Sequence, residues 1–253
     1  MQIYGSIWRI HDMIRAILTM DDIPSNNTPA IVDYLNEKGI QAIMFAVGRK
    51  LEQHPEQAKY ALQHGMIMGN HSYSHPAFST LSMEESAKEI ETCEELLDQL
   101  YQSAGVKRDY RPFRFPLGDK GGKNKAALQR YLAEKKFSKV KDAQISFAWW
   151  KENGLDRDID TFWTFDFAEY RIRPNSGFTK EDVWKRIHDR NPISGGALLS
   201  ENSSHILLMH AHDETEEMVP GYCCLFIDHL LACGVTFDQP ELIAFPSENK
   251  LRT

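Results

Sequence analysis

The chain has 253 residues, of which 42% are hydrophobic and 26% are charged, and its formal net charge is −7. Such a chain is ordinary for a soluble globular protein with a substantial core, and we expect one domain over residues 1–253. The acidic balance and the lack of a basic stripe argue against nucleic acid as a partner. Because no apolar run approaches the roughly 20 residues that cross a bilayer, and the N-terminus does not resemble a secretory signal, we expect no transmembrane segment and a cytoplasmic location.

Short apolar runs alternate with amphipathic stretches along the chain. The run RAILTM at residues 15–20 is typical of a buried strand, and residues 28–39 then have apolar positions at helical spacing. Further strands are predicted at residues 41–47, 66–72, 110–116, 162–167, 204–212 and 235–239. Further helices are predicted at residues 54–65, 82–105, 124–137, 179–191 and 222–234. The helix after Ser82 also has a capping box, since Glu85 stands three positions beyond the N-cap.

The alternation of strands and helices predicts the fold class. Strands that alternate with helices form a parallel sheet, which places the chain in the α/β class. Seven or eight such units in a chain of 253 residues suggest a distorted (β/α) barrel with seven or eight parallel strands. In barrels of this kind the chemistry takes place at the C-terminal ends of the strands. Polar side chains should therefore gather there if the fold carries an activity.

Polar side chains do lie in or just beyond the C-terminal parts of the predicted strands. They are Asp21, Asp22, His71, His75, Arg114, Asp166 and His210. One carboxylate with two histidines four residues apart is a natural three-ligand set for a divalent metal and leaves a position open for water. A bound cation would also explain why two adjacent carboxylates end a buried strand, because the cation stabilises the ionised form of both.

Five segments carry a specific resemblance. They read LTMDD, GNHSYSHP, FRFPLGD, WTFDFAEY and ILLMH, and they span Thr19 to His210. Their order resembles the five motifs of polysaccharide deacetylases, the NodB-homology enzymes of carbohydrate esterase family 4. The resemblance implies a hydrolase that removes an N-acetyl or other N-acyl group from an amino sugar. The substrate would be a polysaccharide or a precursor of a surface polysaccharide.

The resemblance also implies a metal centre. In the first two motifs, Asp22, His71 and His75 would be the metal ligands. Zn²⁺ is the expected ion for this ligand set, and Co²⁺, Ni²⁺ or Fe²⁺ would also suit it. The ion would polarise the amide carbonyl and activate a water molecule as the nucleophile.

Three further motif positions would be catalytic by the same resemblance. Asp21 would be the general base that takes the proton of the attacking water. Arg114 would hold the Asp21 carboxylate through a charge-assisted pair. His210 would be the general acid that protonates the leaving amine, although the neighbouring His212 and Asp213 could exchange roles with it.

The third and fourth motifs depart from the family pattern. The fourth motif of the family is Asp-x-x-Asp-Trp, and here Glu169 and Tyr170 stand in place of the second Asp and the Trp. The third usually ends in Pro-Tyr or Pro-Arg, whereas Leu117 follows the proline here, and its backbone N–H could help to hold the oxyanion. The interpretation assigns Leu117, Asp166, Glu169 and Tyr170 to substrate binding.

Other functions remain open at the level of sequence. Two histidines and one carboxylate also form the facial triad of non-haem iron oxygenases. The altered fourth motif is compatible with a non-catalytic carbohydrate-binding protein on a decayed deacetylase fold. A deformylase or another amide hydrolase of the same superfamily would use the same site. In each hydrolase interpretation the expected partner is an N-acylated sugar, and the sequence leaves the oligomeric state open.

Overall fold

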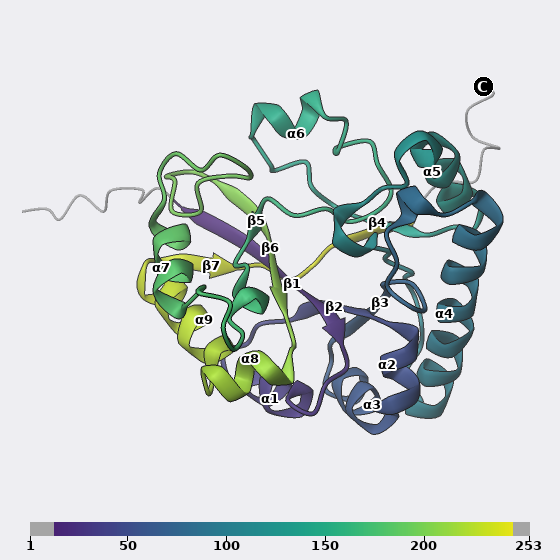
Figure 1. Ribbon diagram of the computed structural model, residues 1–253, viewed down its shortest axis with the longest axis horizontal. Coiled ribbons are helices and arrows are strands. Elements are labelled where there is room, and N and C mark those ends of the chain that lie inside the picture. The colour runs from purple at the N-terminus through teal and green to yellow at the C-terminus, as the bar shows by residue number, and fades with distance from the viewer. Residues whose placement is uncertain (1–12, 245–253) are drawn as a thin grey trace, which may run out of the picture.

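A parallel sheet with helices along its outer side forms the centre of the molecule (Figure 1). This computed structural model describes residues 13–244, so both ends of the single domain expected over residues 1–253 lie outside the described residues. Within residues 13–244, six parallel strands make up the main sheet in the order β3-β2-β1-β6-β5, and β7 also pairs with β1. The strands are β1 (Ile14–Ile23), β2 (Ala42–Ala46), β3 (Ile67–Asn70), β5 (Phe165–Asp166), β6 (Ser204–His210) and β7 (Val235–Phe237). The expected α/β class is confirmed, but the described residues contain six parallel strands rather than seven or eight, because two further strands pair antiparallel in a separate sheet.

A second, smaller sheet distorts the barrel. It pairs β4 (Ser138–Val140) and β8 (Leu242–Ala244) in antiparallel orientation. The strand expected at residues 110–116 makes only isolated bridges, from Phe113 to Asn70 and from Pro112 to Ser138. Since a proline has no N–H for a strand ladder, Pro112 and Pro116 keep this segment from pairing continuously. The segment nevertheless lies between β3 and β4 and links the two sheets.

Nine α-helices are described between residues 13 and 244. They are α1 (Thr28–Glu37), α2 (Gly48–Gln53), α3 (Pro55–Gln63), α4 (Met83–Ala104), α5 (Lys125–Glu134), α6 (Ala148–Glu152), α7 (Lys180–His188), α8 (Asp213–Met218) and α9 (Tyr222–Ala232). Helices α4 and α9 pack on one face of the sheet, while α6 packs on the other. The capping box of α4 is confirmed, because Ser82 Oγ accepts from the Glu85 N–H at 3.1 Å and Glu85 Oε2 accepts from the Ser82 N–H at 2.8 Å. Sequence analysis did not predict α2, α6 and α8, whose five or six residues are too few to show a helical period.

Both faces of β1 are buried, as a parallel sheet between two layers requires. Leu18 and Met20 face the outer helices and pack in one cluster with Leu97 of α4 and Phe226 of α9. Ile17 points the other way, into a cluster with Trp150 under β4 and β8. The strands are thus held rigidly, and the side chains at their C-terminal ends are placed by a well-packed core. Among the helices described between residues 13 and 244, none combines the length and apolarity needed to cross a membrane.

Candidate active site

The polar side chains singled out in the sequence meet at the C-terminal end of the sheet. The register of β1 and β6 places Asp21 directly beside His210, and His71 follows the last residue of β3, which β2 separates from β1. Together they line a cavity of about 310 Å³. Its walls are formed by Asp21, Asp22, His71, His75, Leu117, Trp163, Asp166, Tyr170, Leu208, His210 and His212.

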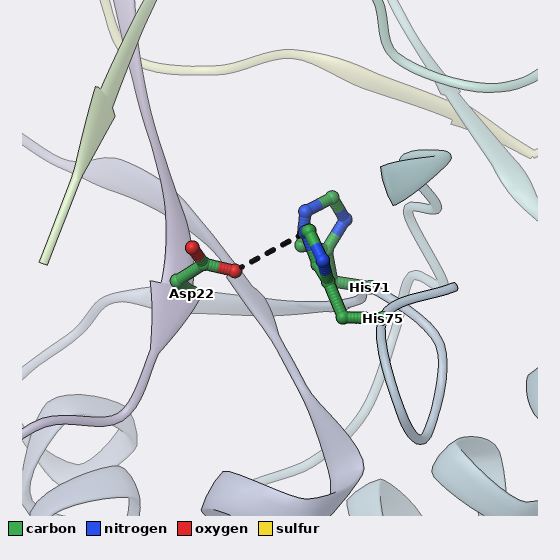
Figure 2. Close-up of side chains that lie close together, drawn as sticks. All are labelled: Asp22, His71 and His75. Carbon is green, nitrogen blue, oxygen red and sulfur yellow. Dashed lines mark ion pairs between the residues drawn. The ribbon is translucent and has the colours of Figure 1, made fainter. Parts of the chain in front are cut away.

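Three of these side chains form a compact group of ligand atoms. Asp22 at the end of β1 faces His75, with Oδ1 3.4 Å from Nε2, and His71 lies beside them (Figure 2). One ligand atom from each of Asp22, His71 and His75 can be chosen so that all lie within 4.8 Å of one another. The Nδ1 atom of His71 lies 2.8 Å from the Arg114 carbonyl oxygen. Because a carbonyl only accepts, Nδ1 carries the proton and Nε2 keeps its lone pair, so the donor set fits a divalent metal such as Zn²⁺.

The backbone around these ligands is held in an unusual conformation. Asp22 and His75 both have φ of 61°, and Ser72 has φ of 64°, in the left-handed region that residues other than glycine rarely adopt. Lys50 Nζ donates to the Asp22 carbonyl at 2.8 Å, and Ser72 Oγ accepts from the His75 N–H at 3.1 Å. The Ser72 contact lies within the loop after β3 that carries both histidines, whereas the Lys50 contact holds the backbone of Asp22. Such backbone strain is concentrated at functional sites.

Asp21 and Arg114 form a buried ion pair beside the ligands. Arg114 Nη1 lies 2.7 Å from Asp21 Oδ1, and both side chains are almost fully buried. The guanidinium also donates to Thr19 Oγ1 at 2.8 Å and to the Thr161 carbonyl at 2.9 Å. The second carboxylate oxygen of Asp21 lies 3.3 Å from His71 Nε2. The structure thus places Asp21 at the metal-ligand group with one oxygen fixed by Arg114 and the other facing the cavity.

His210 is held from behind by Glu169. Glu169 Oε1 lies 3.2 Å from His210 Nδ1 and also accepts from the His210 backbone N–H. Burial alone would lower the pKa of His210, but the bond to Glu169 and the charges of Glu169, Asp21 and Asp22 outweigh it and raise the pKa to about 9. His210 is therefore protonated at neutral pH in this arrangement. A protonated imidazole is the form that a general acid requires.

The four side chains expected to bind substrate divide into two groups. Leu117, Asp166 and Tyr170 line the cavity, and the Tyr170 ring lies 4.6 Å from the His210 ring. Glu169 is fully buried and does not line the cavity, so the structure corrects its expected position from the groove wall to the layer behind His210. The reason is the left-handed turn at Ala168, with φ of 57°, which directs the chain back beneath the imidazole.

Three cavity residues, Trp163, Leu208 and His212, were not assigned a place in the site from the sequence. Trp163 is the first residue of the fourth segment, three positions before Asp166, and lies outside β5, so no strand alternation indicated its place in the cavity. His212 was considered only as a substitute for His210, but its Nε2 lies 2.6 Å from Asp22 Oδ2. Burial opposes ionisation of Asp22, yet the His212 bond and the charges of the surrounding histidines hold the pKa of Asp22 well below its usual value. The two-residue period of a strand was the signal that pointed His212 to the same side as His210.

Comparison with known proteins gives a consistent assignment. Residues 11–134 match the family model described as polysaccharide deacetylase. The chain is 30% identical to chitin deacetylase 1 of Cryptococcus neoformans over 183 residues, which are 68% of this chain and 38% of that protein. It is 36% identical to a peptidoglycan-N-acetylglucosamine deacetylase of Bacillus cereus over 84 residues, which are 33% of this chain and 30% of that protein. The matches thus span about a third of each relative.

The fold is similar to that of solved structures over nearly the whole chain. A family 4 carbohydrate esterase from Streptomyces lividans in complex with acetate superposes with a TM-score of 0.58 at 20% identity, covering 89% of this chain and 92% of that one. At this identity the structural similarity establishes only the fold, a distorted barrel with a parallel sheet. The evidence for the family comes from the sequence matches. The match over residues 11–134 therefore assigns this part of the chain to the polysaccharide deacetylase family, and the fold of the described residues agrees with that assignment.

Proposed function

We propose that the protein is a metal-dependent hydrolase that removes an N-acetyl group from an amino sugar. The observation that carries the proposal is the convergence of three functional parts on one cavity. These parts are the ligand group around Asp22, the buried Asp21–Arg114 pair, and His210 held by Glu169. Their side chains come from the C-terminal ends of β1, β3 and β6 and from the segments that follow strands, which is the usual construction of an active site in a barrel.

Each side chain has a role that its contacts support. Asp21 accepts the proton of the attacking water, and Arg114 holds its carboxylate in place through the 2.7 Å contact. His210, protonated and held by Glu169, donates a proton to the leaving amine. A divalent metal bound by Asp22, His71 and His75 would supply Lewis acidity toward the amide carbonyl and the water.

The proposed substrate is a glycan that contains N-acetylglucosamine. The relatives are named for deacetylation of chitin and of peptidoglycan, whose common unit is this sugar. The exposed Leu117 side chain and the rings of Trp163 and Tyr170 give the cavity apolar walls on which a sugar ring can pack.

The alternative functions are less well supported by the same contacts. A carbohydrate-binding protein on a decayed fold would not need the Arg114 pair with Asp21 or the Glu169 contact with His210, and both are present. An iron oxygenase would leave Asp21 and Arg114 without a role. A deformylase would use the same residues, so the released acid separates the two hydrolases.

The test combines metal analysis with product analysis. Protein purified without chelator should carry about one zinc ion per chain, and the His71→Ala/His75→Ala variant should carry none. The zinc form should release acetate, and not formate, from N-acetylglucosamine oligomers or peptidoglycan fragments. Wild-type protein that binds metal yet releases no acid from any of these glycans would contradict the proposed function.

A further inference from the structure

We propose that His212, supported by Arg173, is a positioning residue that fixes the Asp22 carboxylate for metal binding. The inference rests on the metal site of the proposed function and adds the residues that would orient its carboxylate ligand. His212 stands just beyond the end of β6, at the N-cap of α8, and its side chain is only 11% exposed. It is therefore part of the cavity wall rather than a surface histidine.

The contacts of His212 determine which of its nitrogens carries the proton. Its Nδ1 lies 3.0 Å from Arg173 Nη2, and its Nε2 lies 2.6 Å from Asp22 Oδ2. A guanidinium group has only donors, so Nδ1 must accept the bond from Arg173. The proton of the neutral ring is then on Nε2, and it is donated to Asp22. His212 thus contacts Asp22 as a hydrogen-bond donor, and it has no free lone pair with which to bind a metal itself.

Because of this hydrogen bond, the two oxygens of Asp22 have different partners. Oδ2 is held by His212, while Oδ1 faces His75 Nε2 at 3.4 Å (Figure 2). A carboxylate held at one oxygen presents the other to the metal in a fixed direction. Hydrogen bonds of this kind to a metal ligand commonly change metal affinity by about 10- to 100-fold.

Arg173 is itself held in place, which gives the arrangement its rigidity. Its Nε donates to the Tyr170 carbonyl at 2.8 Å, and its Nη1 lies 3.6 Å from Glu214 Oε2. The contacts run from the segment of the fourth motif through Arg173 and His212 to Asp22. The two sides of the cavity, one with the metal ligands and one with Tyr170, are thereby joined.

The experiment measures Co²⁺ affinity by chelator competition and records the visible absorption of bound Co²⁺. His212→Leu removes both hydrogen bonds, whereas His212→Gln keeps an amide donor for Asp22 and an acceptor for Arg173. The exposed His64 provides a matched control in the variant His64→Leu. We expect about 10- to 100-fold weaker binding for His212→Leu, and affinity and absorption close to wild type for His212→Gln and His64→Leu. Unfolding curves in chelator establish that each variant is folded.

The outcomes separate this inference from the proposed function. Wild-type affinity in His212→Leu would overturn the inference, because the bond to Asp22 would then have no effect on the metal. An equal loss in His212→Gln, with an altered Co²⁺ spectrum, would also overturn it, because His212 would then be a ligand. Wild-type protein that binds no Co²⁺, or a His71→Leu/His75→Leu variant that binds it normally, would instead overturn the proposed metal site.

Discussion

Replacing Glu169 with Gln should lower the pKa of His210 by about two units in the metal-free protein. In the wild type this pKa is raised to about 9, and the hydrogen bond and the charge of Glu169 are the largest contributions that raise it. The substitution keeps the shape of the side chain and removes its negative charge. Burial of His210 then opposes protonation, and only the more distant charges of Asp21 and Asp22 still favour it.

The magnitude follows from the two protonation equilibria. With a pKa of about 9, about 97% of His210 is protonated at pH 7.5, and with a pKa of about 7 the protonated fraction falls to about a quarter. A drop of two units corresponds to about 3 kcal/mol of lost interaction with the imidazolium. The alkaline limb of the pH–rate profile should move to lower pH in the same direction, because the general acid loses its proton earlier.

The assay is an NMR titration of the His210 ring in metal-free protein. Glu201→Gln, which makes the same chemical change at an exposed position, provides the control and should leave the His210 pKa unchanged. A His210 pKa in Glu169→Gln within about half a unit of wild type would refute the reasoning, because Glu169 would then not be what keeps the imidazole protonated.

Three further predictions follow from the buried and exposed groups. Arg114→Leu should reduce the free energy of unfolding by about 3–5 kcal/mol in denaturant titrations, because Asp21 would remain buried without its partner. Lowering the pH from 6.5 to 4 should reduce the free energy of unfolding by up to about 3 kcal/mol through His205, because burial lowers the pKa of His205 in the folded protein to about 4, so that the unfolded chain binds the proton first. The His205→Asn variant should lose less free energy of unfolding over the same pH range. Leu117→Ala should raise KM several-fold with kcat nearly unchanged, because the residue is 70% exposed in the cavity wall, its side chain contributes only to binding, and the substitution leaves its backbone N–H in place.

The long elements could be predicted because their patterns extend over several turns or residues. The capping box at Ser82 and Glu85 and the apolar run that ends in Asp21 and Asp22 both appear in the structure where the sequence indicates them. The segment at residues 110–116 resembles a strand by composition, but its prolines restrict it to isolated bridges. Short elements such as α2 and β4 carry too few residues to show a period.

Some of the cavity residues could be predicted because they lie at the ends of strands with a clear sequence pattern. Alternation along a strand identifies which residues share a face, so the side chains at the ends of β1 and β6 were expected together, and the register places them together. Alternation along a strand gives no information on the positions of loop residues. The left-handed conformation of Ala168, which puts Glu169 behind His210, depends on tertiary contacts that no local pattern records. The tautomer of His212 likewise depends on Arg173, which is 39 residues away in the chain.

The central claim is that a metal centre and the Asp21 base act together in amide hydrolysis, and its most direct test is acetate release by Asp21→Asn. The zinc-loaded wild-type protein should release acetate from an N-acetylglucosamine oligomer. The variant should bind the same amount of zinc, since Asp21 is not among the three grouped ligands, and should be slower by about 100- to 10,000-fold, the range expected for loss of a general base. Near-normal acetate release by the zinc-loaded variant would contradict the account.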